Sequence, residues 1–169
     1  MNFKNILFFC FFFSTLPFAF CQNEENDPDA LSNKTFRERL VFNIGGGVTF
    51  GTVTNIQLLP QVGYRITPRL TSGVGGNFIY FRDNRFSTNN QFLVYGGNVF
   101  TRYALSPELF AQVEYQALAY GGEVGHYGLI GGGYMAGGGV FISGYYLFLY
   151  PSSNNIYGAP YVIRIGFAF

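Results

Sequence analysis

The chain has few of the residue types that proteins most often use for chemistry. Its 169 residues include two cysteines, one histidine, two methionines and no tryptophan. Cys10 and Cys21 both lie in an apolar N-terminal segment, so residues 22–169 contain no thiol for a disulfide, a metal site or a nucleophile. His126 stands among glycines and is expected in a solvated loop, without a catalytic or metal-binding role.

Charge is also scarce. Charged residues make up 11% of the chain, against roughly 25% in an ordinary soluble domain. The chain has ten Lys and Arg and nine Asp and Glu, for a formal net charge of +1. Nucleic-acid binding therefore has no electrostatic basis. The glycine triplets at 45–47, 131–133 and 137–139 lack the lysine and the helix start that a phosphate loop needs. We therefore expect no cofactor and no metal.

What the chain does have is 21 Phe, 13 Tyr and 23 Gly, a composition that favours strands and turns. Apolar residues recur at every second position through most of the sequence, which is the period of a strand with two different faces. Strands are predicted at about 39–50, 55–66, 70–82, 91–104, 109–120, 127–136, 140–150 and 161–169.

The first 37 residues differ from the rest. Lys4 precedes an apolar run that Pro17 interrupts, and the run is too short for a spanning helix of about 20 residues. We predict a signal peptide at 1–21, a polar periplasmic tail at 22–37 and a barrel domain at 38–169. Whether Cys21 is removed with the signal or acylated stays open at this point.

A short motif repeats along the chain. Residues 64–70 (YRITPRL) match residues 103–109 (YALSPEL), and residues 134–140 form a weaker copy with glycines in place of the proline turn. Each copy predicts a hairpin with a tight turn, whereas the intervening connections are expected to be longer and polar. Membrane barrels have this asymmetry between their two ends.

The two faces of the predicted strands differ in a consistent way. The Tyr, Phe, Leu, Ile and Val sets are assigned to the outside. The face assigned to the inside carries many glycines and most mid-strand polar residues: Asn43, Gln57, Gln61, Arg65, Asn77, Asn98, Arg102, Gln112, Glu114, Gln116 and Arg164. A soluble lipocalin-like ligand binder would have the opposite order. A helical membrane protein is the other alternative, but the eight glycines between Tyr127 and Tyr150 disfavour helices.

The expected fold is thus all-β: an eight-stranded antiparallel up-and-down transmembrane β-barrel. Over residues 39–169 the chain resembles the small outer-membrane β-barrel proteins of the OmpA and OmpX type. The resemblance rests on the leader, the hairpin pattern and the last strand, whose outward set looks like a C-terminal assembly signal: Tyr161, Ile163, Ile165, Phe167 and Phe169.

The resemblance implies the outer membrane of a Gram-negative bacterium. It also implies contact with outer-membrane lipid and insertion by the outer-membrane assembly machinery. Roles in this family range from envelope integrity to adhesion, and an extracellular ligand would be unknown. The short loops of this chain weaken any expectation of a large external binding surface.

Inside the barrel, Glu114 is expected to meet Arg65, Arg102 and Arg164 in a lumen charge network. Because eight strands leave an interior just wide enough for side chains to fill, we favour a structural plug over a gated path for small ions.

No enzyme is expected. Chains of similar composition are sometimes labelled α-ketoglutarate decarboxylase, yet no cofactor motif supports that activity here. Outer-membrane phospholipases and lipid A acyltransferases are better alternatives, but they need a serine or histidine with polar partners. His126 without an obvious serine partner is thin support.

Overall fold

The computed structural model describes residues 34–49, 53–83, 90–151, 156–157 and 159–169. The predicted signal peptide at 1–21 and most of the predicted tail lie outside these residues. Residues 35–169 form one compact unit, which opens with a short 3-10 helix, η2, at Arg37–Arg39. Among the described residues, no helix is long and apolar enough to cross a membrane.

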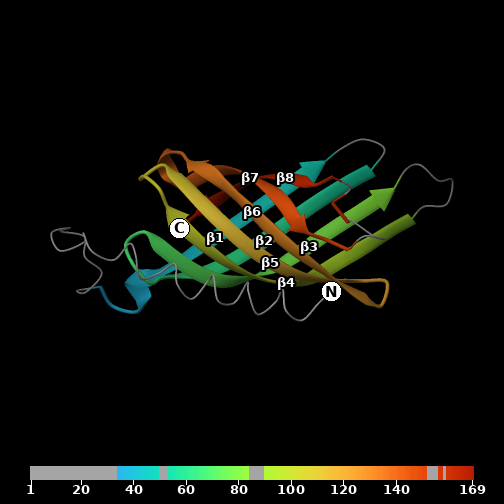
Figure 1. The fold of residues 1–169 in the computed structure, drawn as a ribbon, viewed down its shortest axis with the longest axis horizontal. Helices are drawn as coiled ribbons and strands as arrows, with labels where there is room; N and C mark the ends of the chain where they lie inside the picture. The colour runs from blue at the N-terminus through green and yellow to red at the C-terminus, as the bar shows by residue number, and fades with distance from the viewer. Residues whose placement is uncertain (1–33, 50–52, 84–89, 152–155, 158) are drawn as a thin grey trace. The chain divides into compact units, whose positions relative to one another are not determined.

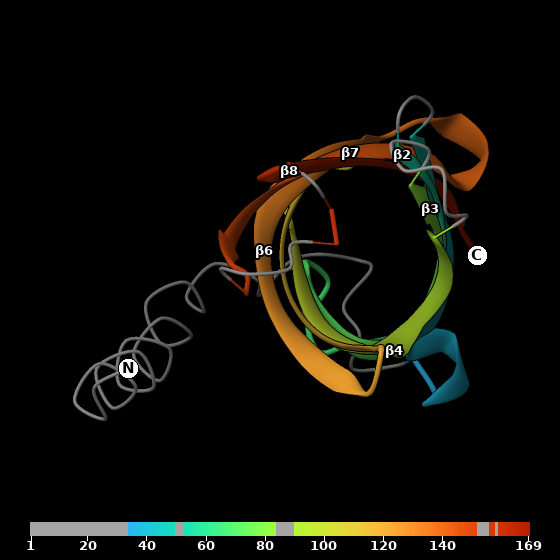
Figure 2. The same cartoon turned by 90° about the vertical axis from the view of Figure 1, so that its right-hand side faces the viewer.

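Eight antiparallel strands follow one another around a closed barrel, each paired with its neighbour in sequence (Figure 1). The view of Figure 2 looks into the ring that they enclose. The fold class is therefore confirmed as an all-β, up-and-down, eight-stranded barrel. The strands are β1 (Leu40–Thr49), β2 (Val53–Arg65), β3 (Leu70–Asp83), β4 (Asn90–Ala104), β5 (Leu109–Tyr120), β6 (Glu123–Met135), β7 (Val140–Leu149) and β8 (Tyr161–Ala168).

The ring closes where the last strand pairs with the first. Ile44 of β1 lies opposite Phe167 of β8, and Phe42 and Phe169 exchange two backbone hydrogen bonds of 3.2 and 2.8 Å. Closure leaves no strand with a free row of backbone donors and acceptors. The apolar last strand, which would be an aggregation hazard at an open edge, is thereby paired on both sides.

The repeated motif forms the same turn twice. Leu70 N–H donates to Thr67 Oγ1 over 3.0 Å, and Leu109 N–H donates to Ser106 Oγ over 3.0 Å. The backbone bonds match as well, because Ile66 N to Leu70 O and Leu105 N to Leu109 O are both 2.8 Å. These turns, with the one at 136–139, lie at the same end of the barrel, which we call the short-turn end.

One connection at the opposite end, the far end, differs from the prediction. The loop expected to hold Glu123 and His126 is a two-residue turn at Gly121 and Gly122, whose φ angles are 57° and 86°. Two positive φ values suit the tight hairpin turn that continues the strand twist. Strand β6 therefore begins at Glu123, and His126 is a strand residue that faces outward.

Alternation sets the two faces of every strand. In β5 the even-numbered residues from Phe110 to Leu118 are buried, while Leu109 and Tyr115 are exposed. All the polar residues assigned to the inside are buried except Arg65, which is exposed. The inward face also carries large apolar residues. The buried ones are Leu59, Ile79, Val94, Phe100, Phe110, Leu118, Tyr127, Leu129, Phe141, Tyr145 and Leu147.

Candidate functional site

The barrel interior is arranged in layers along its length. The inward residues of β5 cross these layers in order from the short-turn end: Phe110, Gln112, Glu114, Gln116 and Leu118. The order is therefore aromatic, polar, acidic, polar and aliphatic. Any function of the interior depends on what these layers contain and on what space they leave.

The central layer contains a buried ion pair. Arg164 of β8 donates to Glu114 Oε2 over 2.8 Å, and the two residues are 3% and 1% exposed. Gln112 and Gln116 donate their amides to the same carboxylate over 3.1 and 2.6 Å. Glu114 thus accepts three hydrogen bonds, which compensates the loss of its hydration.

Arg102 joins this network from the short-turn side. Its Nε donates to Gln112 Oε1 over 2.8 Å, so it reaches Glu114 through one amide and does not touch it. Its guanidinium also lies 4.3 Å from the centre of the Phe110 ring, with Phe141 and Phe100 at 5.4 and 5.9 Å. These three rings offset the poor hydration of a buried cation.

Inward glycines make room for those rings. A methyl group on Gly166 would lie 2.5 Å from Phe141 Cζ and 2.5 Å from the carbonyl oxygen of Ile44. One on Gly63 would lie 3.2 Å from Phe100 Cζ. Glycine on these strands therefore permits close packing of the interior rings.

An apolar layer closes the far end of the interior. Ile79, Leu118, Leu129 and Leu147 are its largest fully buried aliphatic members, and Tyr127 packs edge-on against Tyr157 at 5.5 Å. The Tyr157 hydroxyl donates to Gln116 Oε1 and so joins the apolar layer to the charge network. Burial raises the pKa of the Tyr157 phenol, which keeps this donor protonated at neutral pH.

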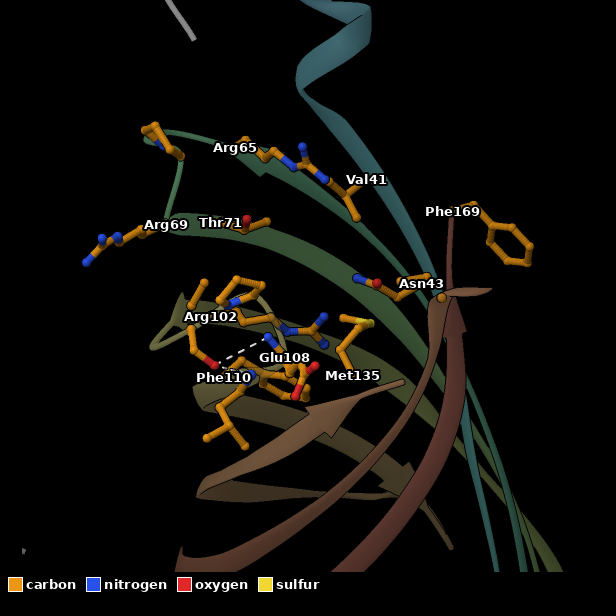
Figure 3. A pocket seen from close by; sticks show the side chains of 17 residues that line it. Val41, Asn43, Arg65, Arg69, Thr71, Arg102, Glu108, Phe110, Met135 and Phe169 are labelled. Carbon is orange, nitrogen blue, oxygen red and sulfur yellow. Dashed lines mark hydrogen bonds between the residues drawn. The ribbon is translucent and has the colours of Figure 1, made fainter. Parts of the chain in front are cut away.

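The short-turn end, in contrast, contains a cavity of about 440 Å³. Figure 3 shows Arg65, Asn43 and Arg102 around it, with Phe110 and Met135 beside Arg102. Arg65 was predicted to join the charge network, and the structure places it elsewhere. It is exposed at the end of β2 and makes no hydrogen bond or ion pair with the residues that the structure describes.

The predicted assembly signal in β8 lies on the outer surface. Tyr161, Ile163, Ile165 and Phe167 are exposed on one side of the strand, and Phe169 is exposed beyond it. Arg164 points the opposite way, into the central layer. The structure therefore separates the two groups of site residues that the sequence places on this one strand.

On the outer surface, the side chain of His126 pairs with one other side chain among the described residues. Its Nδ1 lies 2.7 Å from the Tyr115 hydroxyl, and the two rings stack with centroids 5.9 Å apart. In the described part of the chain, no three His, Cys, Asp or Glu side chains are grouped so that they could hold a metal ion. The structure adds a tyrosine to the surroundings of His126, and no serine or carboxylate contact with this side chain is found among the described residues.

Sequence reasoning missed the short-turn cavity. Its lining comes from one end of every strand except β7, together with residues of the three short turns, so no single stretch of sequence carries its signal. The sequence does contain a signal for the apolar layers, because Phe110 and Leu118 lie on the same face of β5 as Gln112 and Glu114.

Fold and interior together define a class: a small antiparallel eight-stranded barrel with buried polar, charged and apolar side chains inside and an apolar exterior. No family model, curated protein or solved structure matches the chain.

Proposed function

We propose that this protein is an integral outer-membrane barrel with a structural or surface-interaction role in the cell envelope, and without a wide pore. The observation that carries this is the inverted order of its two surfaces. Outward residues of the strands are exposed and apolar, as at Phe42, Leu58, Val74, Val99 and Ile163, while Glu114 and Arg164 are buried. A water-soluble barrel would leave a large apolar surface in contact with water.

The dimensions of the apolar surface agree with a bilayer. Leu70 and Tyr80 are both outward residues of β3, and ten strand residues cover about 34 Å. With a strand tilt of about 45°, this distance corresponds to roughly 24 Å of barrel height, close to the apolar band of about 25 Å on membrane barrels.

Tyrosines lie where the two interfaces of such a band would fall. At the short-turn end Tyr64, Tyr103 and Tyr134 lie opposite leucines of the neighbouring strand. Near the far end, Tyr146 of β7 lies opposite Tyr161 of β8. Tyrosine is enriched at membrane interfaces because its ring is apolar and its hydroxyl is polar.

The layered interior supports a closed barrel over a channel. The cage around Arg102, the Glu114 network and the apolar layer of Leu118 and Leu129 follow one another along the interior. Outside the short-turn cavity, an ion would have to displace side chains that are packed or hydrogen-bonded.

Two measurements test the proposal. The folded barrel extracted from membranes should migrate differently in gels before and after boiling, because closed barrels keep their shape in detergent until heated. Identical mobility would count against a closed membrane barrel. In planar bilayers we expect no steady openings, whereas large and lasting conductance would contradict the filled interior.

A further inference from the structure

The cavity at the short-turn end has two arginine side chains beside it, Arg65 and Arg102. Arg69 and Glu108 also line it, but Figure 3 shows the Arg69 side chain pointing away from Arg65 and Arg102. Arg65 and Arg102 lie in one cross-strand row, because Thr71 is the register partner of both. Two strand spacings of about 4.8 Å separate the two arginines, so their long side chains can approach the same group.

Part of the hydrogen-bonding capacity of this cavity is not used within the described barrel. Asn43 is 1% exposed and lines the cavity, yet neither atom of its amide has a hydrogen-bond partner among the residues that the structure describes. In Figure 3 this amide points toward the side where Arg65 and Arg102 lie. Arg102 uses only its Nε in hydrogen bonds to the residues that the structure describes. A buried amide without a partner is costly in a finished interior, which suggests a site that a ligand completes.

We propose that the short-turn cavity binds a phosphate group carried on a small apolar organic part. Guanidinium groups recognise phosphate through paired hydrogen bonds. A phosphate monoester has a charge of about −1.5 to −2 at neutral pH, so it can pair with both Arg65 and Arg102. A single carboxylate would leave one of these charges unpaired.

The rest of the lining is suited to the organic part. Val41, Pro68, Phe110 and Met135 contribute apolar surface beside the arginines. Inorganic phosphate would leave this surface uncovered, so it is expected to bind more weakly than an aryl or alkyl phosphate. The site opens at the end of the barrel and not on its apolar outer face, which suits a ligand that arrives from water.

Isothermal titration of the purified protein in nonionic detergent with phenyl phosphate tests the site. Wild type should bind phenyl phosphate, bind inorganic phosphate at least several-fold more weakly and not bind phenol. Arg65→Gln should weaken binding at least tenfold without altering the folded gel mobility, because this side chain is exposed and makes no contact that the fold needs. Arg37→Gln is the matched control: it removes an exposed cation next to β1 that does not line the cavity, and affinity should stay within twofold.

The proposal is overturned if wild type does not bind phenyl phosphate, if Arg65→Gln binds it as well as wild type, or if the two variants lose affinity equally. The headgroup of phosphatidic acid is also a phosphate monoester, and a second titration in mixed micelles that contain this lipid separates the two sources. Displacement of phenyl phosphate by this lipid would assign the site to a headgroup. Unchanged affinity would assign it to a water-soluble phosphate monoester.

Discussion

An arginine placed at Val99 would distinguish a barrel in lipid from a barrel in water. Val99 points outward from the middle of β4, is 52% exposed and lies between the register partners Val74 and Tyr115. In water, replacing such a side chain changes stability by no more than about 0.5 kcal/mol. At the centre of a bilayer, an outward arginine on a barrel costs about 2–4 kcal/mol, which lowers the folding equilibrium constant roughly 30- to 900-fold.

The assay is a urea titration of protein refolded into phosphatidylcholine vesicles, with the folded fraction read from unboiled gel samples. Leu105→Arg is the control, because Leu105 is also apolar and 60% exposed but lies in the turn at 105–108. We expect Val99→Arg to shift the midpoint strongly and Leu105→Arg to shift it by less than about 0.5 kcal/mol. Equal midpoints for the two variants would refute the assignment of this surface to lipid.

Two further substitutions test the interior. Glu114→Gln leaves Arg164 buried without its counter-charge and should destabilise the barrel by about 3–5 kcal/mol. Combining Glu114→Gln with Arg164→Gln should recover part of this loss in a double-mutant cycle. A double variant less stable than either single variant would contradict the pairing. Gly166→Ala should lower the stability of the barrel by about 1–3 kcal/mol, because the added methyl group overpacks against Phe141 and the backbone at Ile44. The loss is measured as a lower temperature at which the gel mobility changes from the folded to the unfolded position. Gly144→Ala should change this temperature little, because a methyl group there meets nothing within 4 Å.

The fold could be predicted because the period of the sequence and the period of the structure are the same. In β5 the alternation is uninterrupted, and both bounds of the strand agree with the prediction of 109–120. The start of β6 was misplaced because Gly121, Gly122 and Gly125 resemble a loop in composition. Two of these glycines form the turn, whereas Gly125 continues the strand as a buried residue.

The chemistry of the inward face along the barrel was not predicted, for a different reason. Period two states which residues share a face, but it does not state that a face has one chemistry along its whole length. Phe110 and Leu118 are in phase with Glu114 and share its side of the sheet. The interior changes from aromatic to acidic to aliphatic between Phe110 and Leu118. Only the phase of the pattern indicates this change, because residue type alone would assign Phe110 and Leu118 to the outside.

Alternation does not predict how deep a residue lies along the barrel axis. Arg65 is an example. Its phase is that of Gln61, and by phase alone it belongs with Glu114. The register places it opposite Thr71 and, one strand further, in the row of Arg102 and Gln112, so that Glu114 lies two residues deeper on β5. That register is fixed by the turn at 66–69, where Ile66 and Leu70 form the closing backbone bond. Since the second copy of this turn carries Ala104 where the first carries Arg65, the two copies share a backbone geometry while only one of them supplies an inward arginine to the rim.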